Sequence, residues 1–427
     1  MAKIIIDIFS QPWVIIALIA LLGLIIQRSS LSQTISGTLK ATIGFVIILV
    51  AAQIIIGALR PIEQMLTYAF NLEGFAPVDE LVVAAVAAEL GTETALIILF
   101  GFILNLVFAR LTPWKYIYLT GHMLWIHAGA WAVLLYSEGI TGAPAIAIGS
   151  VIQGLYTTLF PALAQPIVRR ITGSDEFAFG HGQTLLAVAG AYIARPFGSP
   201  EQSAEKVEVS DRWSFFRDIA VSTMLIMLVV TVGAALFAGP EYVESELSPG
   251  PNFIVFSLLQ AFTFTAGLLV LLQGVRMFIG EIVPAFRGIA QRVVPGAKPA
   301  LDCPVLYPYA PNSLIIGLVT GTIAQALAIA LIIILGLPVP IPSMIVAFFA
   351  SGSGAIFGNA LAGRRGAIFG GFFWSFAGFL LASWAYYIGL FGNLEGIGAA
   401  GVGFVVPDAI VIAMVVKALL WLVGLVL

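Results

Sequence analysis

Runs of about twenty apolar residues recur from one end of this chain to the other, and a helix of that length crosses a hydrocarbon core roughly 30 Å thick. Charged residues make up only 10% of the 427 positions, whereas a soluble domain has roughly a quarter. Most of the outer surface must therefore face lipid. Because the runs are continuous and do not alternate by twos, the pattern predicts an all-α polytopic membrane protein and excludes a barrel.

Ten segments have the length and character of a spanning helix, so that about 10–11 transmembrane helices are expected. The ten segments are Pro12–Ile26, Ala41–Ala58, Ala95–Ala109, Trp114–Tyr136, Ala143–Leu163, Asp218–Phe237, Phe253–Val275, Ser313–Leu335, Ala367–Leu390 and Asp408–Leu427. Three other apolar stretches, Glu80–Gly91, Gln183–Ala194 and Ile341–Leu361, are short or interrupted by glycine. We predict that the last two are re-entrant hairpins lining a solute path, with a kinked or interfacial helix as the alternative for each.

The two halves of the chain repeat three motifs in the same order, which predicts an internal duplication. The matched pairs are Gly44–Pro61 with Gly267–Pro284, Thr120–His122 with Ala310–Asn312, and Phe179–His181 with Phe357–Asn359. When the loops rich in Arg and Lys are placed in the cytoplasm, the first repeated helix and its copy run in opposite directions. The sequence therefore predicts an inverted repeat, the architecture that gives alternating access to a central site.

These features predict one membrane translocator domain over residues 1–427, with a first repeat over about 12–195 and a second over about 218–427. The polar connection between them, residues 196–217, is predicted to be cytoplasmic. Its charged residues include Glu201, Glu205, Lys206, Glu208, Asp211 and Arg212. The connection is too short for a soluble catalytic domain, and the chain has neither paired carboxylates nor a nucleophile–base motif. We expect no catalytic residue on this chain, so any chemistry belongs to other polypeptides.

Ionisable side chains inside apolar segments cost roughly 2.5–3.5 kcal/mol each unless they are paired or hydrated, so they usually mark a solute path. All three histidines lie in such segments: His122 and His127 on one predicted helix, and His181 at the start of the first predicted hairpin. We predict that they bind hydroxyl or carboxylate oxygens of a solute; the alternative is a hydrogen bond to a neighbouring helix carbonyl. Because His122 and His127 are five residues apart and face different sides of the helix, no metal site is expected.

Asp302, Gln183 and Asn359 complete the predicted substrate-binding set. Asp302 lies in an aromatic segment broken by proline, where a carboxylate is suited to accept hydrogen bonds from a polyol; a helix cap or an ion pair with an arginine is the alternative. Gln183 begins the first predicted hairpin, and Asn359 ends a glycine-rich stretch of the second, whose glycines serve either solute approach or helix packing. Cys303 is the only cysteine, so a disulfide within the chain and a thiolate zinc cluster are excluded.

At these motifs the chain resembles the membrane (IIC) component of the phosphotransferase system for L-ascorbate, with galactitol permeases as distant relatives. The matching motifs are Leu119–His122, Phe179–His181, Gln273–Phe278, Ala285–Arg292 with Pro295–Ala297, and Asp302–Cys303 leading to Ala310–Asn312. The resemblance covers nearly the whole chain. It places sugar contacts at His122, His181 and Asp302.

The resemblance implies a homodimer of inverted repeats in the bacterial cytoplasmic (inner) membrane. Each protomer would carry the sugar in a core domain that moves past a scaffold domain, an elevator motion. Separate cytoplasmic IIA and IIB proteins would relay phosphate from phosphoenolpyruvate to the bound sugar. The expected surroundings are membrane lipid, and we expect no cofactor and no nucleic-acid partner.

Two positions depart from the pattern of ascorbate permeases. Glutamines are expected four residues after the first histidine and directly after the second, but this chain has Ile126 and Gly182 there. His127 and Gln183 each follow one residue later. Isoleucine cannot replace the hydrogen bonds of an amide, each worth roughly 1 kcal/mol or more in a buried site. The substrate is therefore predicted to be L-ascorbate or a related sugar acid or pentose derivative.

Two alternatives belong to other functional classes. An ion-coupled secondary transporter of the same architecture would use His122 and Asp302 as proton sites. Its uptake would survive loss of phosphoenolpyruvate and collapse with the proton gradient. A membrane-embedded enzyme acting on lipid is the second alternative, and it would form product without transport.

Overall fold

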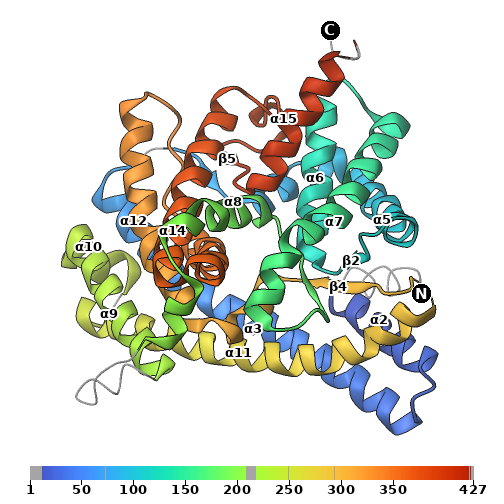
Figure 1. The fold of residues 1–427 in the computed structure, drawn as a ribbon. Helices are drawn as coiled ribbons and strands as arrows, with labels where there is room; N and C mark the ends of the chain where they lie inside the picture. The colour runs from blue at the N-terminus through green and yellow to red at the C-terminus, as the bar shows by residue number, and fades with distance from the viewer. Residues whose placement is uncertain are drawn as a thin grey trace.

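The computed structural model describes residues 12–72, 74–207, 218–248, 250–292, 294–422 and 424, and most of them are helical (Figure 1). The polar residues Glu208, Asp211 and Arg212 of the predicted connection lie outside the described residues. The α-helices are α2 Pro12–Ile26, α3 Leu31–Ala69, α4 Asp79–Ala85, α5 Ala87–Leu111, α6 Gly121–Ser137, α7 Gly142–Thr172, α8 Thr184–Ala194, α9 Ile219–Ala238, α10 Pro240–Tyr242, α11 Phe253–Arg292, α12 Pro311–Ile334, α13 Met344–Val346, α14 Gly352–Tyr387 and α15 Pro407–Leu422.

Six of the described helices are long and apolar enough to cross a membrane, or seven spans if the pair Thr223–Ala238 and Pro240–Leu247, bent by 103°, is counted as one. Two segments predicted as spans form shorter helices among the described residues, α6 with 17 residues and α15 with 16, while α2 has the predicted bounds and 15 residues. Large apolar side chains point away from the protein: Ile334 is 80% exposed, Val229 73% and Leu422 70%. Such a surface is suited to lipid and would be costly in water.

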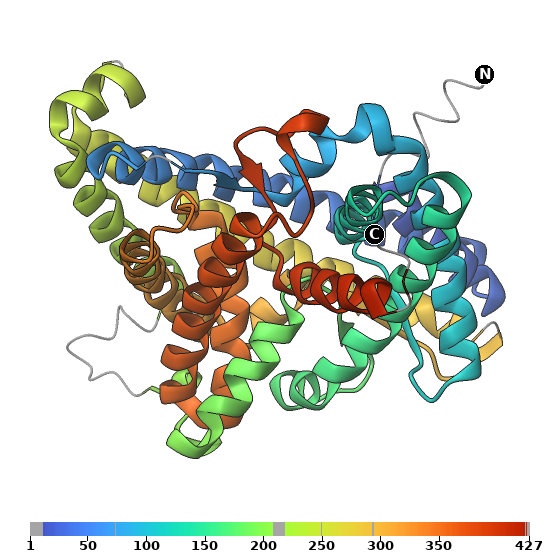
Figure 2. The same ribbon diagram turned by 90° about the horizontal axis from the view of Figure 1, so that it is seen from above.

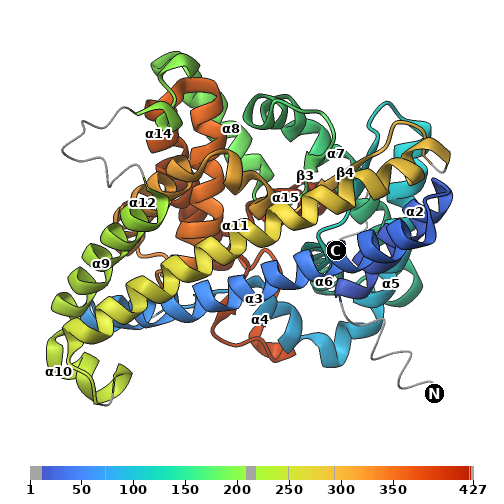
Figure 3. The ribbon, with the colours of Figure 1, turned by 90° about the horizontal axis from the view of Figure 1, so that it is seen from below.

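The longest helices, α3 with 39 residues and α11 with 40, pack side by side along the molecule (Figure 3). They run antiparallel, because Gly44 of α3 lies against Phe278 of α11, while Ile55 further along α3 lies against Gly267, an earlier residue of α11. A Cβ atom at Gly44 would be 2.7 Å from the Phe278 nitrogen, so glycine permits this close approach. Helices α2 and α9 pack against the same pair.

Helix α14 is a helical hairpin. Its chain reverses at Gly363, which has φ 62° and ψ −152°, a backbone conformation that favours glycine. The two arms then meet through facing glycines: a Cβ atom at Gly358 would be 2.0 Å from the Gly366 oxygen, and one at Gly354 would be 2.6 Å from the Gly370 oxygen. These glycines serve the approach of one helix to another, which was one of the two interpretations of the glycine-rich segment.

The prediction of an all-α chain missed five short strands: β1 Ala76–Pro77, β2 Tyr116–Tyr118, β3 Ala178–Phe179, β4 Lys298–Leu301 and β5 Val402–Gly403. Strands β2, β4 and β3 form a parallel sheet in that order, and β1 pairs with β5. The predicted span Trp114–Tyr136 was consequently wrong in its first part, since β2 precedes a helix that begins only at Gly121.

The outer edge of β2 is closed by a side chain. The buried Asn105 of α5 donates through Nδ2 to the Tyr116 oxygen at 3.0 Å and accepts from the Tyr118 nitrogen at 3.1 Å, replacing the bonds of a missing strand. Backbone groups within an apolar interior must be paired, so this amide allows a three-stranded sheet to end inside the protein. In the view of Figure 2, the C-terminal helices α14 and α15 (orange to red) lie beside α8, and α15 also packs against α6.

Candidate functional site

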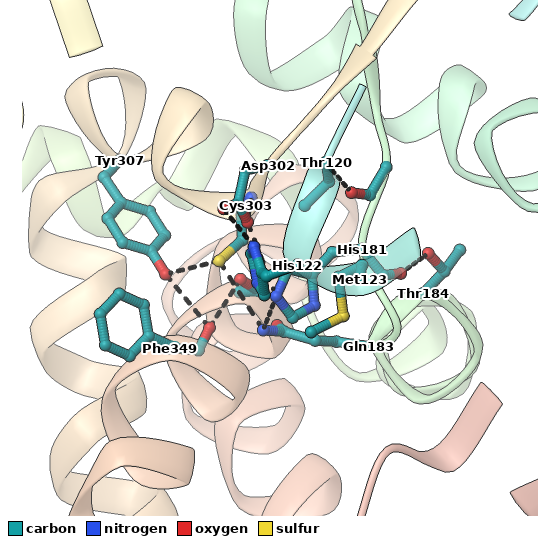
Figure 4. Close-up of polar contacts among 12 residues, drawn as sticks. Thr120, His122, Met123, His181, Gln183, Thr184, Asp302, Cys303, Tyr307 and Phe349 are labelled. Carbon is teal, nitrogen blue, oxygen red and sulfur yellow. Dashed lines mark hydrogen bonds and ion pairs between the residues drawn. The ribbon is translucent and has the colours of Figure 1, made fainter. Parts of the chain in front are cut away.

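The candidate site forms where the three parallel strands end. Strand β2 ends at Tyr118 and is followed by His122 in the first turn of α6; β3 ends at Phe179 and is followed by His181. The central strand β4 ends at Leu301, and Asp302 follows directly. Because parallel strands end at the same edge of a sheet, three residues far apart in sequence meet there, as Figure 4 shows.

Asp302 lies between the two histidines. His122 Nδ1 is 3.7 Å from Asp302 Oδ2, and His181 Nε2 is 3.6 Å from Asp302 Oδ1. The side chain of His122 is 40% exposed, that of Asp302 26% and that of His181 10%, so the group is reachable from one side and buried on the other. Both distances exceed the usual hydrogen-bond length of about 2.7–3.2 Å, so neither histidine is hydrogen-bonded to Asp302.

Threonine hydroxyls hold the strand ends in place. Thr120 donates to the Gly180 oxygen at 2.5 Å, which ties the end of β2 to the end of β3. Thr184 donates to the His181 oxygen at 2.7 Å, which closes the turn into α8. Gly180 itself lies so near β4 that a Cβ atom there would be 3.0 Å from Ala300. These contacts fix the backbone that carries His181.

Gln183 borders the group on its buried side. Its Nε2 atom lies 3.5 Å from His181 Nε2 and 3.7 Å from the Cys303 sulfur, while Oε1 is buried with no partner among the described residues. Cys303 in turn accepts from the Tyr307 hydroxyl at 3.3 Å, and that hydroxyl also contacts the Phe349 oxygen at 3.2 Å (Figure 4). Cys303 and Tyr307 were missed as site residues, although both stand in the segment that drew attention to Asp302.

His127 is buried on the next turn of α6 and points elsewhere. Its Nδ1 atom contacts the Met123 oxygen at 2.7 Å, and its ring stacks on Tyr156 with centroids 4.2 Å apart. Its Nε2 atom is buried with no partner among the described residues. A Cβ atom at Gly182 would be 2.9 Å from the His127 ring, so a larger residue at 182 would collide with this imidazole.

Asn359 is not brought to this group by the structure. Its Oδ1 atom accepts from the Ala204 nitrogen at 2.8 Å, and its Nδ2 atom contacts the Ser203 hydroxyl at 3.0 Å. Next to it, Glu205 accepts from the backbone nitrogens of Asn312 and Ser313 at 3.0 and 2.8 Å and so caps α12. Both side-chain atoms of Asn359 therefore hold the connection between the two halves of the chain.

A buried carboxylate that the sequence analysis did not select supports the site from behind. Asp408, at the start of α15, accepts from the backbone nitrogens of Thr184 and Leu185 at 3.1 and 2.8 Å, and from the Tyr156 hydroxyl at 3.3 Å. It thereby caps the N-terminus of α8, directly after His181 and Gln183. An ionisable residue at the start of an apolar run was the signal that could have found it.

The opposite edge of the sheet carries a charged cluster. Asp175, just before β3, contacts Arg169 Nε at 2.7 Å, Lys298 Nζ at 2.5 Å and Gln165 Nε2 at 2.7 Å. Partial burial favours the neutral carboxyl, but the hydrogen bonds from Arg169, Lys298 and Gln165 outweigh it and lower the pKa of Asp175 to about 2. The cluster joins the end of α7 to the start of β4.

The group around Asp302 is suited to binding. Its carboxylate and imidazoles can hydrogen-bond the hydroxyls of a polar solute, and no nucleophile–base pair lies among the described site residues. A helical bundle with an apolar outer surface and a cluster of polar side chains where its helices are interrupted has the architecture of a solute permease.

The chain belongs to the family of sugar-specific permease components of the phosphotransferase system (EIIC-GAT), whose model matches residues 7–420. The resemblance found from its motifs is thereby confirmed, and with its apolar helices this makes it a multi-pass membrane protein. A curated relative, the ascorbate-specific EIIC component of the phosphotransferase system of Mycoplasma pneumoniae, is 26% identical over 411 residues. The match covers 84% of this chain but only 62% of the relative, so this chain spans less than two thirds of that protein's length.

Proposed function

We propose that this chain is the sugar-translocating IIC subunit of a phosphoenolpyruvate-dependent phosphotransferase system in the bacterial cytoplasmic (inner) membrane. Its substrate is L-ascorbate or a related sugar acid or pentose derivative, and separate IIA and IIB proteins phosphorylate it. The observation that carries this proposal is the meeting of His122, His181 and Asp302 at the ends of three strands in a member of a sugar-specific permease family.

The chemistry of these side chains fits a molecule with several hydroxyls. Asp302 accepts hydrogen bonds only, whereas each neutral imidazole both donates and accepts, so the three together bind adjacent hydroxyl and enol oxygens. Gln183 adds an unpartnered carbonyl oxygen at the buried side. The imidazole of His127 occupies the space that a side chain at Gly182 would need, so glycine at 182 and histidine at 127 fit together.

Transport in this proposal is an elevator motion of a core past a scaffold. Helices α2, α3, α9 and α11 pack with one another and carry none of the predicted substrate contacts, as expected of a scaffold. The antiparallel pairing of α3 with α11 supports the inverted repeat, as does the contact between the matched phenylalanines Phe179 and Phe357, whose centroids are 5.2 Å apart. The proposed assembly is a homodimer.

Thermal melting of the purified protein with a panel of ligands tests the substrate. The panel is L-ascorbate, other sugar acids, pentoses, pentitols and galactitol, with EDTA present throughout. A ligand that binds only the folded state raises the melting temperature, by an amount equivalent to about 2.7 kcal/mol at one hundred times its Kd. A shift with ascorbate or a relative supports the proposal, and no shift with any compound contradicts a sugar substrate.

The contacts of Asp302 with two histidines also favour one alternative, a proton-coupled transporter in which these groups exchange protons. Uptake into vesicles separates the two functions. The proposed permease requires phosphoenolpyruvate with the phosphocarrier proteins and accumulates phosphorylated sugar. Uptake of unmodified sugar driven by a proton gradient alone would establish the alternative.

A further inference from the structure

The geometry around Asp302 suits a second kind of ligand. One nitrogen of His122, one nitrogen of His181 and one oxygen of Asp302 all lie within 4.8 Å of one another. Around a tetrahedral zinc ion with bonds of about 2.0–2.1 Å, neighbouring ligand atoms are about 3.3–3.4 Å apart. The two histidine–aspartate distances, 3.6 Å to Oδ1 and 3.7 Å to Oδ2, come within a few tenths of an ångström of that value. Because they run to different oxygens, the carboxylate turns about its bond for one oxygen to share the ion with both nitrogens.

The two imidazole nitrogens and the Asp302 carboxylate lie close enough together to share one positive ion. Gln183 Nε2 is 3.5 Å from His181 Nε2, a long contact, and with Nδ1 protonated the single lone pair of Nε2 serves either this amide or an ion. A carboxylate oxygen and an imidazole lone pair repel each other unless a positive group or a donor lies between them. A metal ion supplies that positive charge at the point where the three atoms meet.

We propose that His122, His181 and Asp302 bind a divalent transition-metal ion such as Zn²⁺, in competition with the sugar. Two imidazoles and one carboxylate form the ligand set of open zinc sites, which keep a fourth position free, and imidazole ligands disfavour Mg²⁺ and Ca²⁺. The expectation of no metal rested on the spacing of His122 and His127 alone, and it did not include Asp302 standing between His122 and His181.

Two features make the site accessible and hold its ligands in place. His122 is 40% exposed at the side chain, so an ion can enter from that side. The sheet holds Asp302 and His181 in place. Asp302 directly follows the end of β4, and only Gly180 separates His181 from the end of β3. The metal proposal itself does not rest on sugar transport; only the competition with sugar does.

Calorimetric titration of the purified protein with zinc chloride tests the proposal. The protein is stripped with EDTA, dialysed and made without a histidine tag. We expect one ion per chain, and substitution of any one ligand by His122→Asn, His181→Gln or Asp302→Asn should weaken binding at least about tenfold, as loss of metal contacts generally does. His127→Gln is the matched control, because this histidine lies outside the group and should leave the zinc affinity unchanged.

Cobalt chloride gives a second readout that does not depend on the stability of a variant. Co²⁺ in the proposed site should show the intense visible absorption of tetrahedral coordination by nitrogen and oxygen, and an excess of the sugar found by thermal melting should abolish it. Absence of zinc binding to the wild-type protein, or equal binding in H122N and H127Q, would overturn the metal site. Sugar binding in EDTA tests the transport proposal separately, so the failure of one is distinguishable from the failure of the other.

Discussion

At the scale of single residues, Asp302 links the two histidines of the candidate site, because each of its oxygens faces one of them. It also accepts from the Cys303 nitrogen at 2.6 Å and so caps the turn that follows β4. Asparagine keeps the size and the capping oxygen of this side chain but removes its charge and replaces one acceptor by a donor. The substitution therefore separates ligand binding from folding.

We predict that Asp302→Asn lowers the affinity for the sugar by about ten- to a hundredfold, since a hydrogen bond to a charged group contributes roughly 1.5–3 kcal/mol. Calorimetry with the ligand identified by thermal melting measures the change. Asp218→Asn is the control: Asp218 caps α9 through the Ala220 and Val221 nitrogens, far from the sheet in sequence, and asparagine caps equally well. An unchanged affinity in D302N would remove Asp302 from the site.

The charged cluster around Asp175, at the other edge of the sheet, predicts that the stability of the fold depends on pH. The pKa of Asp175 is about 2 in the folded chain, below the value of about 3.9 in an unfolded one. The cluster therefore stabilises the fold above about pH 4, and this contribution is lost as pH falls through about 2. Because the Asp175 side chain is 45% exposed, solvent and salt screen the effect and keep it small.

Melting temperatures recorded between about pH 5 and pH 2 for the wild-type protein and for Asp175→Asn measure this contribution. The two proteins should differ most at the upper end and converge at the lower end. High salt should reduce the difference at every pH. A difference that grows as the solution becomes more acid would contradict the depressed pKa.

At the scale of elements, Asp408 connects α15 to the segment that carries His181 and Gln183. Two backbone nitrogens at the start of α8 depend on its carboxyl group, that of Thr184 buried and that of Leu185 part-buried. We predict that Asp408→Ala lowers the free energy of unfolding by several kcal/mol, because leaving a buried donor unsatisfied costs about 1–3 kcal/mol. Sugar affinity should fall with it, since α8 begins directly after Gln183.

Thermal melting and ligand titration of Asp408→Ala and Tyr156→Phe measure both effects. The second variant removes one hydrogen bond to Asp408 and keeps the cap of α8, so it should lose much less sugar affinity. Equal losses in the two variants would mean that the cap does not position the site.

The sequence predicted helices far better than the sheet that builds the site. The span predicted over Pro12–Ile26 is a helix with those bounds, because a helix pairs the backbone groups of an apolar run within the run itself, as an apolar surrounding requires. Strand β2 has three residues inside the apolar run Trp114–Tyr136, and its partner β4 begins at Lys298. Hydrophobic periodicity cannot detect a strand that short, nor a pairing across such a separation.

Site residues were predictable where a polar side chain interrupts an apolar segment. His122, His181 and Asp302 were selected for that reason, and the structure brings them together. Asn359 was selected on the same ground, but its amide binds the connection at Ser203 and Ala204. Whether a buried polar group serves a solute or a backbone depends on neighbours that only the fold supplies, so the pattern finds candidates without assigning their partners.

At the scale of the whole molecule, the proposed transport requires two bodies that move past each other. In this proposal Glu63 of α3 lies at the contact between the two bodies: it accepts from the Ser343 hydroxyl and from the Ile345 nitrogen, both at 3.3 Å, at the start of the segment that continues into α14. Within the pair α3 and α11, by contrast, glycines bring backbones into direct contact, as at Gly267 and Ile55. The first contact should change during transport, and the second should persist.

Cross-linking tests this difference. Cysteines introduced by Glu63→Cys with Ile345→Cys, joined by a short thiol cross-linker that a reductant cleaves, should stop sugar uptake while leaving sugar binding intact, and reductant should restore uptake. The control pair, Lys40→Cys with Glu281→Cys, replaces a partly exposed ion pair between α3 and α11, two helices of the proposed scaffold, and should leave uptake unchanged after cross-linking. The native Cys303 is buried, so wild-type protein treated in the same way shows the background. Full uptake with the first pair completely cross-linked would mean that α3 and the segment leading into α14 move together, and the boundary between core and scaffold would have to lie elsewhere.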